Sequence, residues 1–216
     1  YYENNVAGTV TLLQAMQERE VTIAGQHRPL GAPFHVLATQ NPIEQEGTFP
    51  LPEAQLDRFL MHVRIGYPEA SAEAEILRLA RERARETLHT TAVAVSRMPL
   101  EDVFAARSAV LDLHVAPQLE RYMIELVLAS RAPARYDPPL ARRIAWGASP
   151  RGSIALERCA RARAWLAGRD FVTPDDVRAI AADVLRHRVL PSYEATAEGW
   201  DGDRLVAALL DVVPLP

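Results

Sequence analysis

The pattern of hydrophobic and polar positions changes near residue 68 of this 216-residue chain. Before this point, short apolar segments alternate with turns that contain proline and glycine, which is typical of mixed strands and helices. After it, apolar residues recur at helical spacing almost to the C-terminus. We therefore expect two units, an α/β unit over residues 1–68 and an all-α helical bundle over residues 69–216.

The first unit should contain a β-hairpin followed by a buried strand. Val21 and Ile23 alternate with polar residues and Gly25 stands at a turn, so a hairpin is predicted over residues 21–30. The continuous apolar run FHVLAT predicts a buried strand at 34–39. The remaining expected elements are a helix at 9–19, a short helix at 52–59 that Pro52 opens, and a strand at 61–65 (MHVRI).

The second unit should consist of helices whose starts are marked by proline and acidic residues. Thr173 and the acids that follow it form a strong helix start. On the helix that they open, Ile180, Val184 and Leu185 share one face and should be buried. We expect the bundle from about residue 99 onward to fold without the first 68 residues. The predicted helices are 69–86, 99–113, 117–131, 149–168, 173–185 and 201–211, and the stretch YDPPLARR at 136–143 is expected to be a turn.

Composition narrows the chemistry that this chain can support. All 24 basic residues are arginine, so a Schiff base and the lysine of a phosphate loop are both excluded from it. The sequence contains no HExxH or CxxC pattern, and its histidines are scattered, so no metal site is predicted. The net charge of −4 gives no basic excess for nucleic acid, and no apolar run has the length of a membrane span.

The N-terminal residues and the single cysteine indicate the cellular compartment expected for the chain. A lone Cys159 cannot form an internal disulfide, and no signal peptide precedes the fold, so we expect a cytoplasmic protein. The first residue is Tyr1 rather than methionine, and we therefore expect the chain to begin within a longer protein.

Three polar residues are candidates for chemistry. Asn41 follows the predicted strand at 34–39, at the sheet edge where ligands bind in α/β folds, although a turn-capping role before proline fits that position better. Arg58 could reach a phosphate in another subunit or could simply pair with Asp57 on the surface. Arg151 lies in the first turn of a helix, where it could help the free N–H groups to bind an anion or could be an ordinary surface arginine.

Two long motifs resemble the MoxR family of AAA+ ATPases. They are ATQNPIEQEGTFPLPEAQLDRF, and GASPRGS followed by GRDFVTPDDVRAIAADVLRHRV. The resemblance extends over nearly the whole chain from about residue 9. It implies the C-terminal part of a P-loop AAA+ core, with the phosphate loop and the Mg²⁺-binding acidic pair upstream of Tyr1, followed by a helical lid. ATP and Mg²⁺ are then expected as cofactors of the full-length parent, and neither is expected to bind tightly to this chain alone.

The resemblance also assigns roles to the candidate residues. For Asn41 and Arg58 it favours the functional interpretation over a turn cap and a surface ion pair. Asn41 matches sensor 1, which helps to position the attacking water. Arg58, in LDRF, matches the arginine finger that completes a neighbour's site, and Arg151, in SPR, matches sensor 2, which touches the γ-phosphate. The hairpin at 21–30 resembles an insertion that faces the pore of a ring.

The family further implies a homo-oligomeric ring, a hexamer, that carries out chaperone-like remodelling or maturation of partner proteins, often with von Willebrand factor A-domain partners. Two alternatives stay open. One is a non-enzymatic helical adaptor that has lost the ATPase half. The other is a magnesium-chelatase-like or DNA motor, although the hairpin stretch carries only Arg28 and His27 as basic residues, which is few for a DNA-tracking pore.

Overall fold

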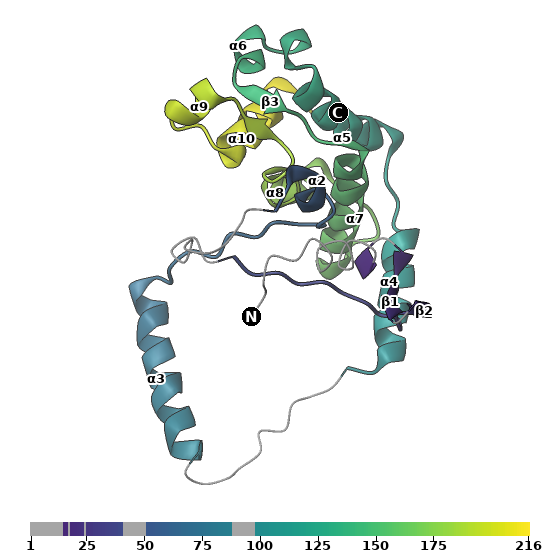
Figure 1. Ribbon diagram of the computed structural model, residues 1–216, viewed down its shortest axis with the longest axis vertical. Coiled ribbons are helices and arrows are strands. Elements are labelled where there is room, and N and C mark those ends of the chain that lie inside the picture. The colour runs from purple at the N-terminus through teal and green to yellow at the C-terminus, as the bar shows by residue number, and fades with distance from the viewer. Residues whose placement is uncertain (1–14, 17, 24, 41–50, 88–97) are drawn as a thin grey trace.

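The computed structural model describes residues 15–16, 18–23, 25–40, 51–87 and 98–216, and its main body is a bundle of helices (Figure 1). Within these ranges only small two-stranded sheets occur. The elements are β1 (Glu20–Ile23), β2 (Gln26–Pro29), α2 (Glu53–Leu56), α3 (Ala70–Thr87), α4 (Leu100–Asp112), α5 (Pro117–Arg131), η1 (Pro133–Arg135), α6 (Pro138–Ala141), β3 (Ile144–Trp146), α7 (Pro150–Leu166), α8 (Pro174–Leu185), β4 (Leu190–Pro191), α9 (Tyr193–Ala197) and α10 (Gly202–Val212).

The predicted hairpin is confirmed. Strands β1 and β2 pair in antiparallel register, with Val21 opposite Arg28. Gly25 at the turn has a φ of +77°, a left-handed conformation that glycine adopts without a Cβ penalty. The alternation of apolar and polar residues therefore located this element correctly.

The strands predicted at 34–39 and 61–65 are wrong. Both segments are irregular in this structure, and Leu37 and Ile65 have 84 % and 93 % of their surfaces exposed. A strand is held by hydrogen bonds to a neighbouring strand, and neither segment has one beside it among the described residues. Apolar runs alone thus did not suffice to form the sheet expected for the first unit.

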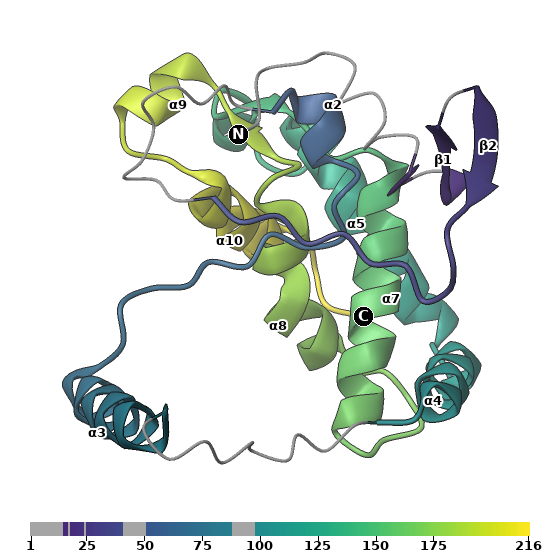
Figure 2. The ribbon, with the colours of Figure 1, turned by 60° about the horizontal axis from the view of Figure 1, so that its bottom comes forward.

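The helices predicted for the second unit are confirmed to within a few residues. Helices α5, α7, α8 and α10 pack around one apolar core (Figures 1 and 2). Val184 and Leu185 are fully buried and Ile180 is 8 % exposed, as their helical spacing predicted. The expected turn at 136–143 instead holds α6, and the β3–β4 pair and α9 were not anticipated.

The start of α8 shows why these helices begin where they do. Thr173 and Asp176 form a reciprocal capping box, in which each side chain accepts a hydrogen bond from the backbone of the other residue. Arg169 donates two hydrogen bonds of 2.6 Å to the Asp176 carboxylate. These arginine hydrogen bonds are the main reason why the pKa of Asp176 falls to about 2, although burial opposes the shift.

Helix α3 lies apart from the bundle in both views (Figures 1 and 2). Its apolar side chains Ile76, Leu77 and Leu79 are all exposed. None of the described helices combines the length and the apolar character needed to cross a bilayer.

Candidate functional site

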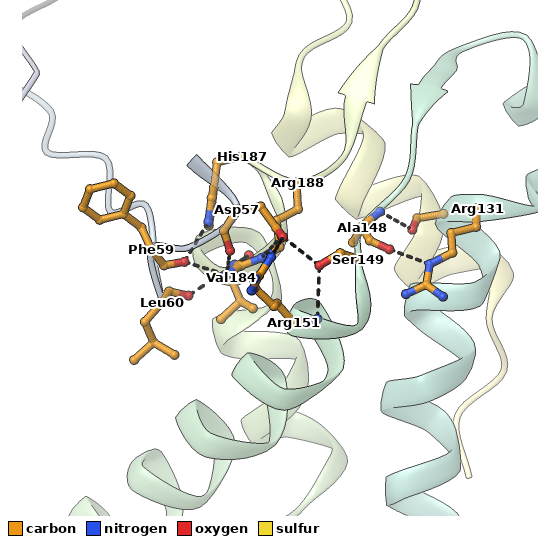
Figure 3. Close-up of polar contacts among 11 residues, drawn as sticks. Asp57, Phe59, Leu60, Arg131, Ala148, Ser149, Arg151, Val184, His187 and Arg188 are labelled. Carbon is orange, nitrogen blue, oxygen red and sulfur yellow. Dashed lines mark hydrogen bonds and ion pairs between the residues drawn. The ribbon is translucent and has the colours of Figure 1, made fainter. Parts of the chain in front are cut away.

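The turn after α2 lies against the beginning of α7, and this contact brings two of the predicted site residues close together. Arg58 lies two residues after the end of α2, and Arg151 lies in the first turn of α7. Asp57, the residue before Arg58, bonds to Arg151 (Figure 3). Asn41, the third predicted residue, lies outside the described residues.

The carboxylate of Asp57 is the centre of this contact. Its Oδ2 accepts hydrogen bonds from Ser149 Oγ at 2.7 Å and from Arg151 Nη1 at 3.1 Å. Its Oδ1 accepts one from Arg188 Nε at 3.1 Å. Figure 3 shows the three donors converging on Asp57 from the start of α7 and from the segment after α8. One carboxylate thus joins a turn near residue 57 to two distant parts of the helical unit.

Arg188 is the most deeply buried charge at this site, with 2 % of its side chain exposed. Besides Asp57 Oδ1, its guanidinium donates to the carbonyl oxygens of Asp57 at 3.0 Å, Phe59 at 2.5 Å and Leu60 at 3.3 Å, and to that of Val184. The planar fork of arginine donors suits this set of acceptors in a way that a lysine ammonium does not. Arg188 therefore holds the backbone on both sides of Arg58.

Neighbouring residues extend the contact along the chain to residue 64. His187 Nε2 donates to the Phe59 carbonyl at 3.2 Å, and Arg186 Nη1 donates to the His62 carbonyl at 2.6 Å. The His62 amide donates to the carbonyl of Asp183 at 2.7 Å. At the far end, Arg64 forms ion pairs with Asp201 and Asp203 before α10 and in its first turn. The segment 57–64 is thus bonded to the helical unit over its whole length.

The turn that presents Ser149 and Arg151 is itself fixed by α5. Ala148 donates its backbone N–H to Ser130 Oγ at 2.9 Å, and its carbonyl accepts from Arg131 Nε at 2.6 Å (Figure 3). Ser149 then caps α7 by accepting a hydrogen bond from the Arg151 amide. The end of α5 therefore determines where α7 begins and where Arg151 lies.

Opposing effects act on the charges of the site. Burial raises the pKa of Asp57, but hydrogen bonds from Ser149 and Arg151 and the charge of Arg188 outweigh it, so the pKa lies below its usual range. Burial lowers the pKa of Arg188, and the Asp57 carboxylate opposes that shift. The pair is therefore held together by mutual compensation of two desolvated charges.

Arg58 differs from the other arginines of this site because two of its side-chain nitrogens have no hydrogen-bond partner among the described residues. Its side chain is half-buried, and its Nε and Nη1 atoms are covered without a hydrogen-bond acceptor among the described residues. Buried unpaired donors cost free energy, and a guanidinium is suited to bind a carboxylate or a phosphate. Within the described ranges, no group of histidine, cysteine and acidic side chains could hold a metal ion. The chemistry that the unpaired Arg58 donors support is anion binding.

Comparison with known protein families accounts for this arrangement. Residues 4–61 match the model of the ATPase family associated with various cellular activities (AAA), and residues 140–209 match the AAA lid domain. The chain is 38 % identical over 209 residues to chaperone MoxR1 of Mycobacterium tuberculosis and 36 % identical over 218 residues to protein MoxR of Paracoccus denitrificans. The chain belongs to the MoxR family of AAA+ ATPases.

The lengths of these relatives and a solved structure complete the comparison. Each alignment covers 95 % of this chain but only 53 % of MoxR1 and 62 % of the Paracoccus protein. A crystal structure from Cytophaga hutchinsonii, provisionally named an ATPase, superposes with a TM-score of 0.88 and 40 % identity, covering 98 % of this chain and 63 % of that one. The MoxR-family chain therefore has the AAA+ fold with its helical lid and spans a little over half the length of these relatives.

The sequence identified Arg58 and Arg151 of this MoxR-family site but not Asp57 as the partner that Arg151 shares with Arg188. It suggested Asp57 only as a surface partner of Arg58, whereas the Asp57 carboxylate binds Ser149, Arg151 and Arg188. Arg188 was not selected at all. The available signal was an arginine just after the predicted helix and next to Val189, four residues beyond Val184 of the apolar face, where a buried charge requires a partner.

Proposed function

We propose that this MoxR-family chain is the lid and the C-terminal part of the core of a ring-forming ATPase, and that Arg58 completes the nucleotide site of a neighbouring subunit. The boundary between core and lid is placed near residue 68. The observation that carries the proposal is the Arg58 guanidinium, which has two covered nitrogens without an acceptor. A phosphate of a neighbouring subunit would supply that acceptor once the side chain turned outward at the subunit interface.

In this proposal each candidate residue has a separate task. Arg58 donates to oxygens that gain negative charge as the terminal phosphoryl group is transferred. Arg151, at the start of α7, binds the terminal phosphate and so joins the nucleotide to the lid. Asn41 positions the attacking water. Bound Mg²⁺ would neutralise phosphate charge, and its ligands are expected in the phosphate-binding half of a longer parent protein.

At the level of the whole protein, we propose a homo-hexameric ring that uses ATP hydrolysis for chaperone-like remodelling or maturation of partner proteins. A von Willebrand factor A-domain protein is the proposed kind of partner. The chaperone name of the M. tuberculosis relative supports this choice over a helical adaptor. The hairpin β1–β2 is proposed to face the central pore.

In this proposal the phosphate-binding half belongs to a longer parent protein, and the test is Arg58→Ala in that full-length parent. We expect ATP hydrolysis to fall by about 10³-fold or more, as for other arginine fingers, while ATP affinity changes little because binding relies on the phosphate loop. Steady-state ATPase rates and calorimetric ATP titration measure the two quantities. Arg135→Ala, which removes an exposed arginine of η1, is the matched control and should retain activity. Equal ATPase rates for the two variants would contradict a role of Arg58 in ATP hydrolysis.

A further inference from the structure

The three side chains that donate to Asp57 differ in their freedom to leave it. Arg188 is 2 % exposed and is held by several backbone carbonyls as well as by Asp57. Ser149 is fixed as the cap of α7. The Arg151 side chain is 48 % exposed and bonds to Asp57 through a single nitrogen. Arg151 is therefore the partner that can exchange with solvent or with another anion at low cost.

We propose that Asp57 is a positioning residue that competes with the terminal phosphate of the nucleotide for Arg151. In the state described here, Asp57 holds Arg151. When a phosphate captures Arg151, the Arg151–Asp57 pair must break. This inference rests on the proposed function, because it takes Arg151 to be the residue that contacts the nucleotide.

The rest of the contact makes this exchange feasible. After Arg151 leaves, Asp57 Oδ1 still accepts from Arg188 and Oδ2 still accepts from Ser149, so the carboxylate is not left buried and unpaired. The exchanged pair is half-exposed, and pairs of this kind contribute little to stability. A phosphate with two negative charges is a stronger acceptor for a guanidinium than one carboxylate oxygen. The free-energy cost of breaking the Arg151–Asp57 pair is therefore small enough for a phosphate to displace Asp57.

The position of Asp57 also gives the exchange a consequence for the next residue. Asp57 directly precedes Arg58, and the Arg151–Asp57 bond is one of the bonds that fix this turn on the lid. A ligand that removes this bond makes the turn less stable on the lid. By linkage, the turn in its bonded position weakens the binding of that ligand by the same free energy. Phosphate binding by Arg151 and the position of the Arg58 turn are thus coupled through the Asp57 carboxylate.

The direct test is Asp57→Asn in the full-length parent protein. Asparagine keeps an oxygen for Arg188 Nε but offers Arg151 no negative charge. We expect the Kd for the non-hydrolysable analogue AMP-PNP to fall by about two- to fivefold, which is the range of a half-exposed ion pair. The Kd for ADP, which lacks the terminal phosphate, should stay unchanged. In an Arg151→Ala background the gain should vanish.

The matched control is Asp203→Asn. Asp203 also joins the lid to the 57–64 segment, through Arg64 and Arg186, but does not touch Arg151. Asp203→Asn should leave the affinities for AMP-PNP and ADP unchanged. This control separates the loss of the Asp57 charge from a general weakening of the contact between the lid and the 57–64 segment. Should Asp57→Asn fail to fold, Ser149→Ala serves instead. Removing the second donor on Oδ2 strengthens the hold on Arg151 and should weaken AMP-PNP binding but not ADP binding.

Two results would overturn the inference: an unchanged ratio of AMP-PNP to ADP affinity, whether neither affinity changes or both rise equally, or a gain that persists without Arg151. These results differ from a failure of the proposed function. If the unmodified parent binds neither nucleotide, the proposed function fails and takes the inference with it. If the parent binds both nucleotides and only the ratio is insensitive to Asp57, the inference alone fails.

Discussion

Arg188 illustrates what a single residue contributes to this site. A buried guanidinium is costly, and the cost is compensated only when its donors find acceptors. Here the acceptors are one carboxylate oxygen of Asp57 and carbonyls on both sides of Arg58. The backbone around Arg58 is therefore held by a side chain that is more than 120 residues away in the sequence.

His187, next to Arg188, makes the stability of this contact dependent on pH. Its Nε2 donates to the Phe59 carbonyl, so Nδ1 is the unprotonated nitrogen, and Nδ1 is buried without a partner. Burial and the nearby Arg188 charge lower the pKa of His187 to about 4, from 6.5 in an unfolded chain. Because the unfolded state binds the extra proton, the free energy of unfolding falls as the pH drops from 6.5 to 4.

We expect this one histidine to remove about 2–3 kcal/mol of stability across that pH range. His187→Gln keeps a donor for the Phe59 carbonyl but does not titrate, so its stability should fall less steeply between pH 6.5 and pH 4. Urea unfolding at several pH values measures both slopes. Carboxylates such as Asp176 lose their contribution only below pH 4, outside this window. Parallel slopes for His187→Gln and the unmodified chain would contradict the assignment.

At the scale of elements, the long helices and the β1–β2 hairpin could be predicted from the sequence, whereas the strands expected at 34–39 and 61–65 do not form. Helix α8 is specified locally, by the box of Thr173 and Asp176 and by apolar residues at helical spacing, and it forms as expected. The segment 34–39 has a suitable apolar run but no adjoining strand within the part of the chain that the structure describes, and it is irregular. The site follows the same rule. The motifs identified Arg58 and Arg151, whereas the partner that joins Arg151 to Arg188 depends on long-range packing.

The junction between β3 and α7 gives a test at this scale. Gly147 passes so close to the end of α5 that an added Cβ would lie 2.4 Å from the Ser130 carbonyl oxygen and 2.7 Å from the Arg131 nitrogen. Both are backbone atoms, which cannot move without shifting the helix. Gly147→Ala should therefore cost about 2 kcal/mol or more and displace the turn that carries Ser149.

The control for this variant is Gly66→Ala, where an added Cβ would meet nothing within 4 Å. Urea unfolding of both variants measures the difference in their free energies of unfolding. Gly66→Ala should lie within about 0.5 kcal/mol of the unmodified chain, as surface substitutions usually do. Equal stability of the two variants would show that α5 and the turn do not approach as closely as described.

At the scale of the molecule, the lid core is built from a contiguous part of the chain, residues 113–213, and the 57–64 segment lies along its surface (Figure 2). Met61 packs against this core while Asp57 and Arg64 are held by ion pairs at either end of the segment. Under the proposed function, movement of the lid would carry the Arg58 turn with it. A ring would then transmit the state of one lid to the nucleotide of the next subunit.

The most direct test of this account mixes two inactive forms of the full-length parent. One form carries Arg58→Ala and an intact phosphate loop, and the other has a disabled phosphate loop but keeps Arg58. If Arg58 acts on the neighbouring subunit, some interfaces in mixed rings pair a competent site with an intact arginine, and ATP hydrolysis is partly restored. Native mass spectrometry establishes that mixed rings have formed. Mixed rings that stay inactive would contradict the assignment of Arg58 to the neighbour's site.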